Sequence, residues 1–245
     1  TLGEGLRDFL RTDGHRVDWC ASLADTDALR GEPYDAWLVD WQLPDGSPTM
    51  IPDGLFPRRT SDGALEILDD AGHVSMRMPA NSLYFDTVYE PLAGVTTVAE
   101  IEAWEPFSIS DAELAWLRSE AQRLRATTDK AIIALTGIKI YEGAQAARGW
   151  QRFMEDLRAA PLLAEAVLER LATRAMAVLE RYLDAVGEYV DAIQVGDDLG
   201  TQAGPQLSPR MYRRLVKPYQ QQVWQFIKRR SGLPVFLHCC GGIYP

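Results

Sequence analysis

Residues 112–237 alternate between long helical patterns and short apolar segments, and this alternation constrains the fold more than any other feature. The apolar spacing predicts helices over 112–127, 144–159, 161–186 and 208–230, and strands over 131–135, 189–195 and 233–237. Ser208, followed by Pro209, is the predicted N-cap of the last helix. Strands joined through helices run parallel, because a parallel connection needs a crossover of about a dozen residues or more. The sequence therefore predicts an α/β fold built from parallel βα units.

Two further stretches differ from this alternation. Residues 64–68 and 73–78 flank Asp69-Asp70-Ala71-Gly72, which is typical of a β-hairpin turn. Residues 1–49 show the order helix, strand, helix, strand in shorter pieces. Because the pattern changes near residue 50, we expect one domain over 1–49 and another over 50–245.

Charge and composition argue against several classes of function. The chain has 25 Lys and Arg against 35 Asp and Glu, and this net charge of -10 is unsuited to a nucleic-acid partner. No apolar run approaches the roughly 18 residues that span a bilayer, and no basic amphipathic stretch suits a membrane surface. Three cysteines, two of them adjacent, do not form a disulfide framework. We therefore expect a cytoplasmic protein without a membrane partner.

The first candidate site follows the strand that ends at Val195. The segment 196–202, Gly-Asp-Asp-Leu-Gly-Thr-Gln, places carboxylates and an amide where functional groups of parallel α/β folds gather. Adjacent carboxylates in a partly dry pocket repel, so one of them is expected to hold its proton and act as an acid. Asp197 and Asp198 are therefore catalytic candidates, supported by Gln202. The alternative is that an aspartate only caps a turn.

The second candidate site is His238-Cys239-Cys240-Gly241-Gly242, directly after the last apolar strand. His238 and Cys240 are two positions apart, so on an extended segment they project to the same side. An imidazole and a thiolate make half of a tetrahedral zinc site. Cys239 would point the other way and suits a small buried position. Because no third ligand is evident, a pair of core residues is the alternative.

A cation near the middle of the chain completes the candidates. The guanidinium of Arg148, which precedes Gly149 and Trp150, is available to an anionic group of a substrate or cofactor. The alternative is a salt bridge on the surface.

An ordered series of motifs resembles the uroporphyrinogen decarboxylase superfamily over about residues 50–245. The motifs are Arg148-Gly149 with Phe153-Met154-Glu155-Asp156-Leu157, 183–191, 196–202, Leu207-Ser208-Pro209 with Lys217-Pro218-Tyr219, and 236–241. The resemblance implies a (β/α)8 barrel with its site at the carboxyl ends of the strands, here C-terminally incomplete.

The resemblance implies one of two chemistries. Tetrapyrrole decarboxylases use neither metal nor cofactor and hold the substrate with arginines near the N-terminus and an aspartate at the mouth of the barrel. Their Met-Arg-Gln-Ala-Gly-Arg element has no match here. Related methyltransferases pass a methyl group between a small thiol or methylated donor and a corrinoid protein, using zinc held by His-x-Cys and a later Cys. His238 and Cys240 match the first pair, which favours methyl transfer. The third ligand is expected beyond Pro245.

Residues 1–49 resemble the first half of a response-regulator receiver domain. Asp40, which ends a predicted strand before Leu43-Pro44-Asp45-Gly46, matches the phospho-accepting aspartate. The acidic pair that binds magnesium and the later Thr/Ser and Lys have no match. We expect two unrelated gene fragments joined near Thr49-Met50. The alternatives to an active enzyme are a two-component response regulator that uses Asp40 and an inactive fusion fragment.

Overall fold

The computed structural model describes residues 57–69, 71–82 and 85–243, which lie in one compact unit of the chain, Pro57–Pro245. The receiver-like segment 1–49, its Asp40 and the junction at Thr49-Met50 lie outside the described residues. Predictions about them therefore stay predictions.

A four-stranded antiparallel sheet begins this unit. Its strands are β1 (Arg58–Arg59), β2 (Leu65–Leu68), β3 (Val74–Met78) and β4 (Asp86–Thr87), in that order. The predicted hairpin is confirmed, because β2 and β3 pair antiparallel with Leu65 opposite Met78. Asp69 stabilises the turn: its Oδ1 accepts the amide of His73 at 2.8 Å. An aspartate that bonds its own turn backbone is a common turn device.

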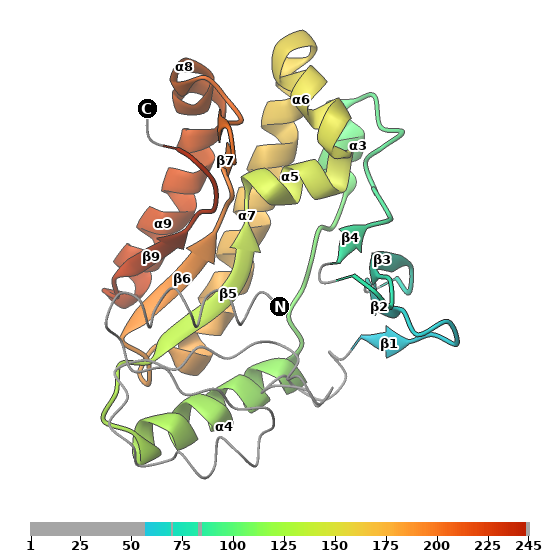
Figure 1. Cartoon of the computed structure of the whole chain (residues 1–245). Helices are drawn as coiled ribbons and strands as arrows, with labels where there is room; N and C mark the ends of the chain where they lie inside the picture. The colour runs from blue at the N-terminus through green and yellow to red at the C-terminus, as the bar shows by residue number, and fades with distance from the viewer. Residues whose placement is uncertain (1–56, 70, 83–84, 244–245) are drawn as a thin grey trace. The chain divides into compact units, whose positions relative to one another are not determined.

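Three parallel strands form the second sheet, in the order β5-β6-β9 (Figure 1). They are β5 (Ile133–Lys139), β6 (Ala192–Gly196) and β9 (Val235–His238). Gln194 at the centre lies opposite Leu135 on one side and Phe236 on the other. The predicted α/β fold with parallel strands is confirmed. The described residues contain three strands of this sheet, so the closed eight-stranded barrel stays a prediction.

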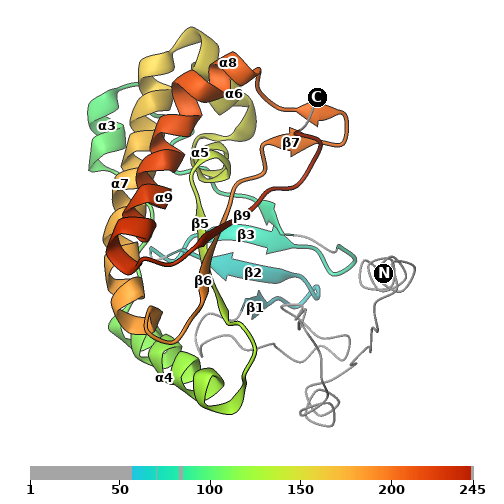
Figure 2. The same ribbon diagram turned by 90° about the vertical axis from the view of Figure 1, so that its left-hand side faces the viewer.

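Helices cover one face of the parallel sheet. The long α7 (Pro161–Val186) packs against β5, and α9 (Lys217–Ser231) packs against β9 and α7. Figure 2 shows the two helices side by side on the same side of the sheet. Ile193 and Val195 of β6 are buried beneath them, together with Leu168, Leu179 and Ile227. The opposite face of the sheet exposes Ile133, Leu135 and Phe236.

The other helices are α3 (Val98–Ala103), α4 (Asp111–Thr127), α5 (Tyr141–Arg148), α6 (Trp150–Ala159) and the short α8 (Pro209–Met211). The π-helical turn η1 (Tyr212–Val216) connects α8 to α9. Ser208 caps α8 as predicted, and its Oγ accepts the amide of Met211. The predicted single helix over 144–159 is wrong: Gly149, with φ of 84°, divides it into α5 and α6. No helix in the described part of the chain is long and apolar enough to cross a bilayer.

Candidate metal site at the ends of the parallel strands

Asp197 fixes the beginning of α5 rather than opening towards a ligand. Its carboxylate accepts the backbone amides of Ile140, Tyr141 and Glu142 at 2.9–3.0 Å. The amide of the Gln220 side chain, on α9, adds a fourth bond at 2.8 Å. The first amides of a helix lack partners within the helix, and Ile140 has no side chain that can cap them. Asp197 therefore supplies the cap from a different strand.

The environment of Asp197 agrees with a structural role. Only 1% of the residue is exposed, and burial raises the pKa of its carboxyl against the opposing effect of the four hydrogen bonds. The predicted substrate contact by Asp197 is not supported by this geometry, because its oxygens are already bonded to α5 and α9. Asp197 instead acts as a cap, which is the alternative role that the sequence allows.

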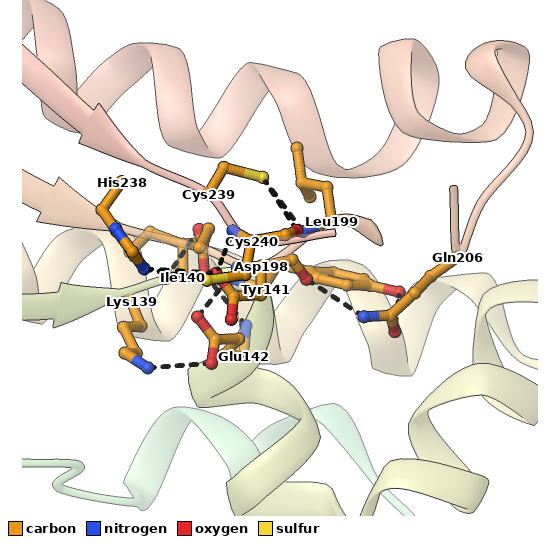
Figure 3. A network of polar contacts seen from close by, with 11 residues as sticks. Lys139, Ile140, Tyr141, Glu142, Asp198, Leu199, Gln206, His238, Cys239 and Cys240 are labelled. Atoms are coloured by element: carbon orange, nitrogen blue, oxygen red, sulfur yellow. Dashed lines mark hydrogen bonds and ion pairs between the residues drawn. The ribbon is translucent and has the colours of Figure 1, made fainter. Parts of the chain in front are cut away.

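Asp198 faces a different set of residues, at the end of β9. Its Oδ1 accepts the amide of Cys240 at 2.7 Å and lies 4.0 Å from His238 Nε2. The Sγ of Cys240 lies 3.2 Å from the same Nε2. Carboxylate oxygen, imidazole nitrogen and thiol sulfur all lie within 4.8 Å of one another. Figure 3 shows the three side chains converging.

Strand register explains why these residues meet. In the parallel pairing of β6 and β9, Gly196 lies opposite His238, and the amide of Asp197 donates to the carbonyl of His238 at 3.1 Å. The two strands thus end together, and the residues that follow each strand meet at one edge. The sequence predicted this meeting of the two segments, but it did not predict that Asp198 would join the His–Cys pair.

Two glycines allow the following loops to approach each other. A Cβ on Gly241 would lie 2.4 Å from the carbonyl carbon of Gly200, and a Cβ on Gly200 would lie 2.8 Å from that of Gly241. Gly241 also has a φ of 88°, which side-chain-bearing residues rarely adopt. Just beyond this contact, the amide of Gly242 donates to the carbonyl of Thr201 at 2.9 Å. The loops that carry Asp198 and Cys240 are therefore held together by backbone contact.

Charge around Cys240 disfavours its thiolate. Partial burial raises the pKa of the Cys240 thiol, and the nearby carboxylate of Asp198 raises it further. A cation between them would reverse this effect, because it would attract both anions. Cys239 faces elsewhere, as predicted: its Sγ accepts the amide of Leu199 at 3.4 Å.

A lysine–glutamate pair that was not predicted adjoins the cluster (Figure 3). Glu142 accepts the amide of Asp198 at 2.8 Å with one oxygen and Lys139 Nζ at 2.8 Å with the other. Lys139 ends β5 and Glu142 lies in the first turn of α5. Their place at the carboxyl end of a parallel strand is the signal that could have identified them, because functional groups of such folds gather there.

The amide near Asp198 belongs to Gln206, not to the predicted Gln202. Gln202 is exposed in the turn between β7 (Gly200–Thr201) and β8 (Gly204–Pro205). Gln206 Nε2 donates to the carbonyl of Asp198 at 3.1 Å, and its Oε1 accepts Gln145 Nε2 at 2.9 Å. The paired β7 and β8 reverse the chain direction, which brings Gln206 back to the site and directs Gln202 outwards.

Arg148 is bonded within the protein, and its predicted role in binding an anionic ligand stays a prediction. Its Nε lies 2.7 Å from Asp156 Oδ2 in a buried ion pair. Its Nη1 donates to the carbonyls of Leu92 and Val95 at 2.5 and 2.6 Å. Since the side chain is only 8% exposed, these bonds hold the segment before α3 against α5 and α6.

The chain is similar to known proteins in sequence and in structure. A family model described as uroporphyrinogen decarboxylase (URO-D) matches residues 92–245. A solved structure of a methyltransferase from Methanosarcina mazei is similar at 15% sequence identity and a TM-score of 0.49. That match covers 68% of this chain and 46% of the methyltransferase, so this chain spans less than half of that protein. No curated protein sequence matches the chain.

Proposed function

The chain belongs to the uroporphyrinogen decarboxylase (URO-D) family, and from this premise we propose that it serves zinc-dependent methyl transfer at sulfur rather than decarboxylation of a tetrapyrrole. The observation that carries the proposal is the convergence of Asp198, His238 and Cys240 within 4.8 Å. A metal-free decarboxylase has no evident use for a thiol and an imidazole at this place.

The three side chains suit zinc by their chemistry. Zinc accepts nitrogen, sulfur and oxygen donors, and catalytic zinc sites usually have three protein ligands and one open position. Asp198 is a candidate for the third ligand beside His238 and Cys240, because its carboxylate is within reach of both side chains.

The protein's own residues would orient this site. Asp198 is held from both sides, because its carboxylate accepts the Cys240 amide and its own amide donates to Glu142. Asp197 fixes the backbone immediately before it. A bound zinc ion would lower the pKa of a substrate thiol, so that a thiolate nucleophile is available near neutral pH. The methyl group would then pass between that sulfur and a corrinoid partner protein.

Decarboxylation is the less favoured reaction because a tetrapyrrole carries several carboxylates that need cationic partners. The arginine proposed from the sequence, Arg148, is buried and bonded to Asp156. Among the residues that the structure describes, Lys139 lies beside the cluster, and its Nζ already contacts Glu142. Asp198 and Glu142 add negative charge to the same edge, which would repel an anionic substrate.

Zinc binding tests the proposal directly. The purified chain is expected to bind one zinc ion, measured by elemental analysis, and cobalt(II) is expected to give a thiolate charge-transfer band. His238→Ala and Cys240→Ser should abolish both signals and Asp198→Asn should weaken zinc binding, whereas Cys239→Ser serves as the matched control and should retain it. A protein that binds no zinc, or a His238→Ala variant that binds it as well as the wild type, would overturn the proposal.

An activity assay separates the two reactions. Methylcobalamin replaces the corrinoid partner in this assay, and 2-mercaptoethanol is the thiol. We expect the absorbance of methylcobalamin to decrease with the wild-type protein and to stay constant with the Cys240→Ser variant. Uroporphyrinogen is expected to remain unchanged. Its decarboxylation by the zinc-free protein would establish the other family reaction instead.

A further inference from the structure

A cleft beside α6 is lined by an exposed indole and by side chains of both charges. Its volume is about 440 Å³, and its lining residues are Glu90, Gly149, Trp150, Gln151, Arg152 and Glu155. Trp150 is 57% exposed, which is unusual for so large an apolar side chain. The cleft is of the size that small-molecule sites usually have.

Glu90 gives the cleft its most available negative charge. Its carboxylate atoms lie 2.6–2.9 Å from the place that a Cβ on Gly149 would occupy, so the carboxylate lies close to the backbone where α6 begins. Within the part of the chain that the structure describes, the Glu90 carboxylate has neither a hydrogen-bond nor an ion-pair partner, although the Glu90 backbone carbonyl accepts the amide of Ala93. A carboxylate without a protein partner, in the same cleft as an exposed indole, is free to meet a cation.

The other charges of the cleft do not cancel the negative charge of Glu90. Arg152 donates Nη1 to the carbonyl of Ala93, and Glu155 adds a second carboxylate that accepts Gln151 Nε2 at 2.9 Å. The amino end of α6 carries a partial positive charge of about half a unit, which is smaller than the full negative charge of Glu90. An anionic ligand would therefore meet a net negative lining.

We infer that this cleft binds a small organic cation of the alkylated ammonium type. The negative face of an indole attracts such a cation, and an alkylated ammonium is desolvated more easily than a metal ion. The cleft lacks the set of convergent oxygens that a hard metal ion requires, because it combines two carboxylates with an indole and a guanidinium.

The cleft is connected to the candidate metal site through one side chain. Trp150 Nε1 donates to Gln206 Oε1 at 3.4 Å, and Gln206 Nε2 donates to the carbonyl of Asp198 at 3.1 Å. The cation site does not depend on the metal site, since Asp198, His238 and Cys240 do not line the cleft. An experiment can therefore contradict the proposed cation binding without contradicting the proposed zinc binding, and the reverse.

Choline is a suitable probe, and 3,3-dimethyl-1-butanol is its neutral isostere. The full chain is titrated with each, with and without zinc, while the indole N–H signal of Trp150 is followed by NMR; the signal is identified by its loss in Trp150→Leu. We expect saturable shifts with choline and at least about tenfold weaker binding of the isostere, as expected if the charge contributes about 1.4 kcal/mol.

Charge variants complete the test. Glu90→Gln should weaken choline binding by a similar factor, whereas Glu102→Gln, at an exposed position of α3, should leave it unchanged. Absence of saturable choline binding, equal affinity for the isostere, or a Glu90→Gln variant that binds choline as well as the wild type would each overturn the inference.

Discussion

Asp197 and Asp198 are adjacent in sequence, yet their carboxylates bond to different parts of the protein. Asp197 accepts three amides at the start of α5 and the side chain of Gln220 on α9. Asp198 accepts the amide of Cys240, after β9. Successive side chains of an extended segment point to opposite sides, which separates the two acids. One therefore stabilises the scaffold, and the other is available to a ligand.

Asp197→Asn should destabilise the protein without removing zinc. In the wild type, both carboxylate oxygens of Asp197 accept N–H groups. An asparagine replaces one of these oxygens by an N–H₂ group, which cannot accept, so at least one buried donor loses its partner. The expected loss in the free energy of unfolding is about 2 kcal/mol, measured by denaturant titration.

Asp198→Asn is the matched control for this change, since it alters the neighbouring carboxylate in the same way. It should leave stability nearly unchanged and weaken zinc binding. Equal stability of the Asp197 variant and the wild type would contradict the capping role.

The pKa of the Cys240 thiol should fall when Asp198 is replaced by asparagine. Burial raises this pKa first, and the charge of Asp198 raises it further. Removing that charge makes the thiolate less unfavourable, so alkylation by iodoacetamide should reach its half-maximal rate at lower pH. The measurement uses metal-free protein in a Cys20→Ser, Cys239→Ser background. An unchanged or higher pH midpoint would show that Asp198 does not act on this thiol.

Much of the architecture could be predicted from the sequence because it depends on local patterns. The periodicity of α7 and the capping serine of α8 are local, and both predictions are confirmed. The capping box of Thr97 and Glu100, which begins α3, is equally local and could have been found. The meeting of residues 197–198 with 238–240 followed from a general property of parallel sheets.

The roles of individual side chains were harder to predict because they depend on contacts distant in sequence. Arg148 was assigned to a ligand, yet Asp156 and two carbonyls near residue 92 bind it. Gln202 was preferred over Gln206 because nothing local indicates the reversal at β7 and β8. The different roles of Asp197 and Asp198 likewise depend on α5, because Asp197 bonds to this helix, which lies more than fifty residues earlier.

Arg148→Met should destabilise the protein strongly, because it leaves Asp156 buried without its partner. Breaking a buried ion pair from one side usually costs roughly 3–5 kcal/mol. Arg230→Met is the comparison, since Arg230 forms exposed pairs with Glu180 and Asp184 and its loss should have a small effect. Denaturant titration of both variants gives the difference. A stable Arg148→Met protein would contradict the structural role of this arginine.

Gly241→Ala should remove zinc binding by separating the two loops that carry the ligands. Its Cβ would overlap the carbonyl carbon of Gly200 at 2.4 Å, and its φ of 88° is strained for alanine. Backbone on both sides cannot yield as a flexible side chain can, so the loop of Cys240 must move away from Asp198.

Gly242→Ala is the matched control, because its Cβ would meet the carbonyl oxygen of Thr201 at an ordinary 3.6 Å. Zinc affinity measured by competition with a chelator should fall in the first variant and persist in the second. If Gly241→Ala retained full affinity, the close approach of the loops would not be what assembles the site.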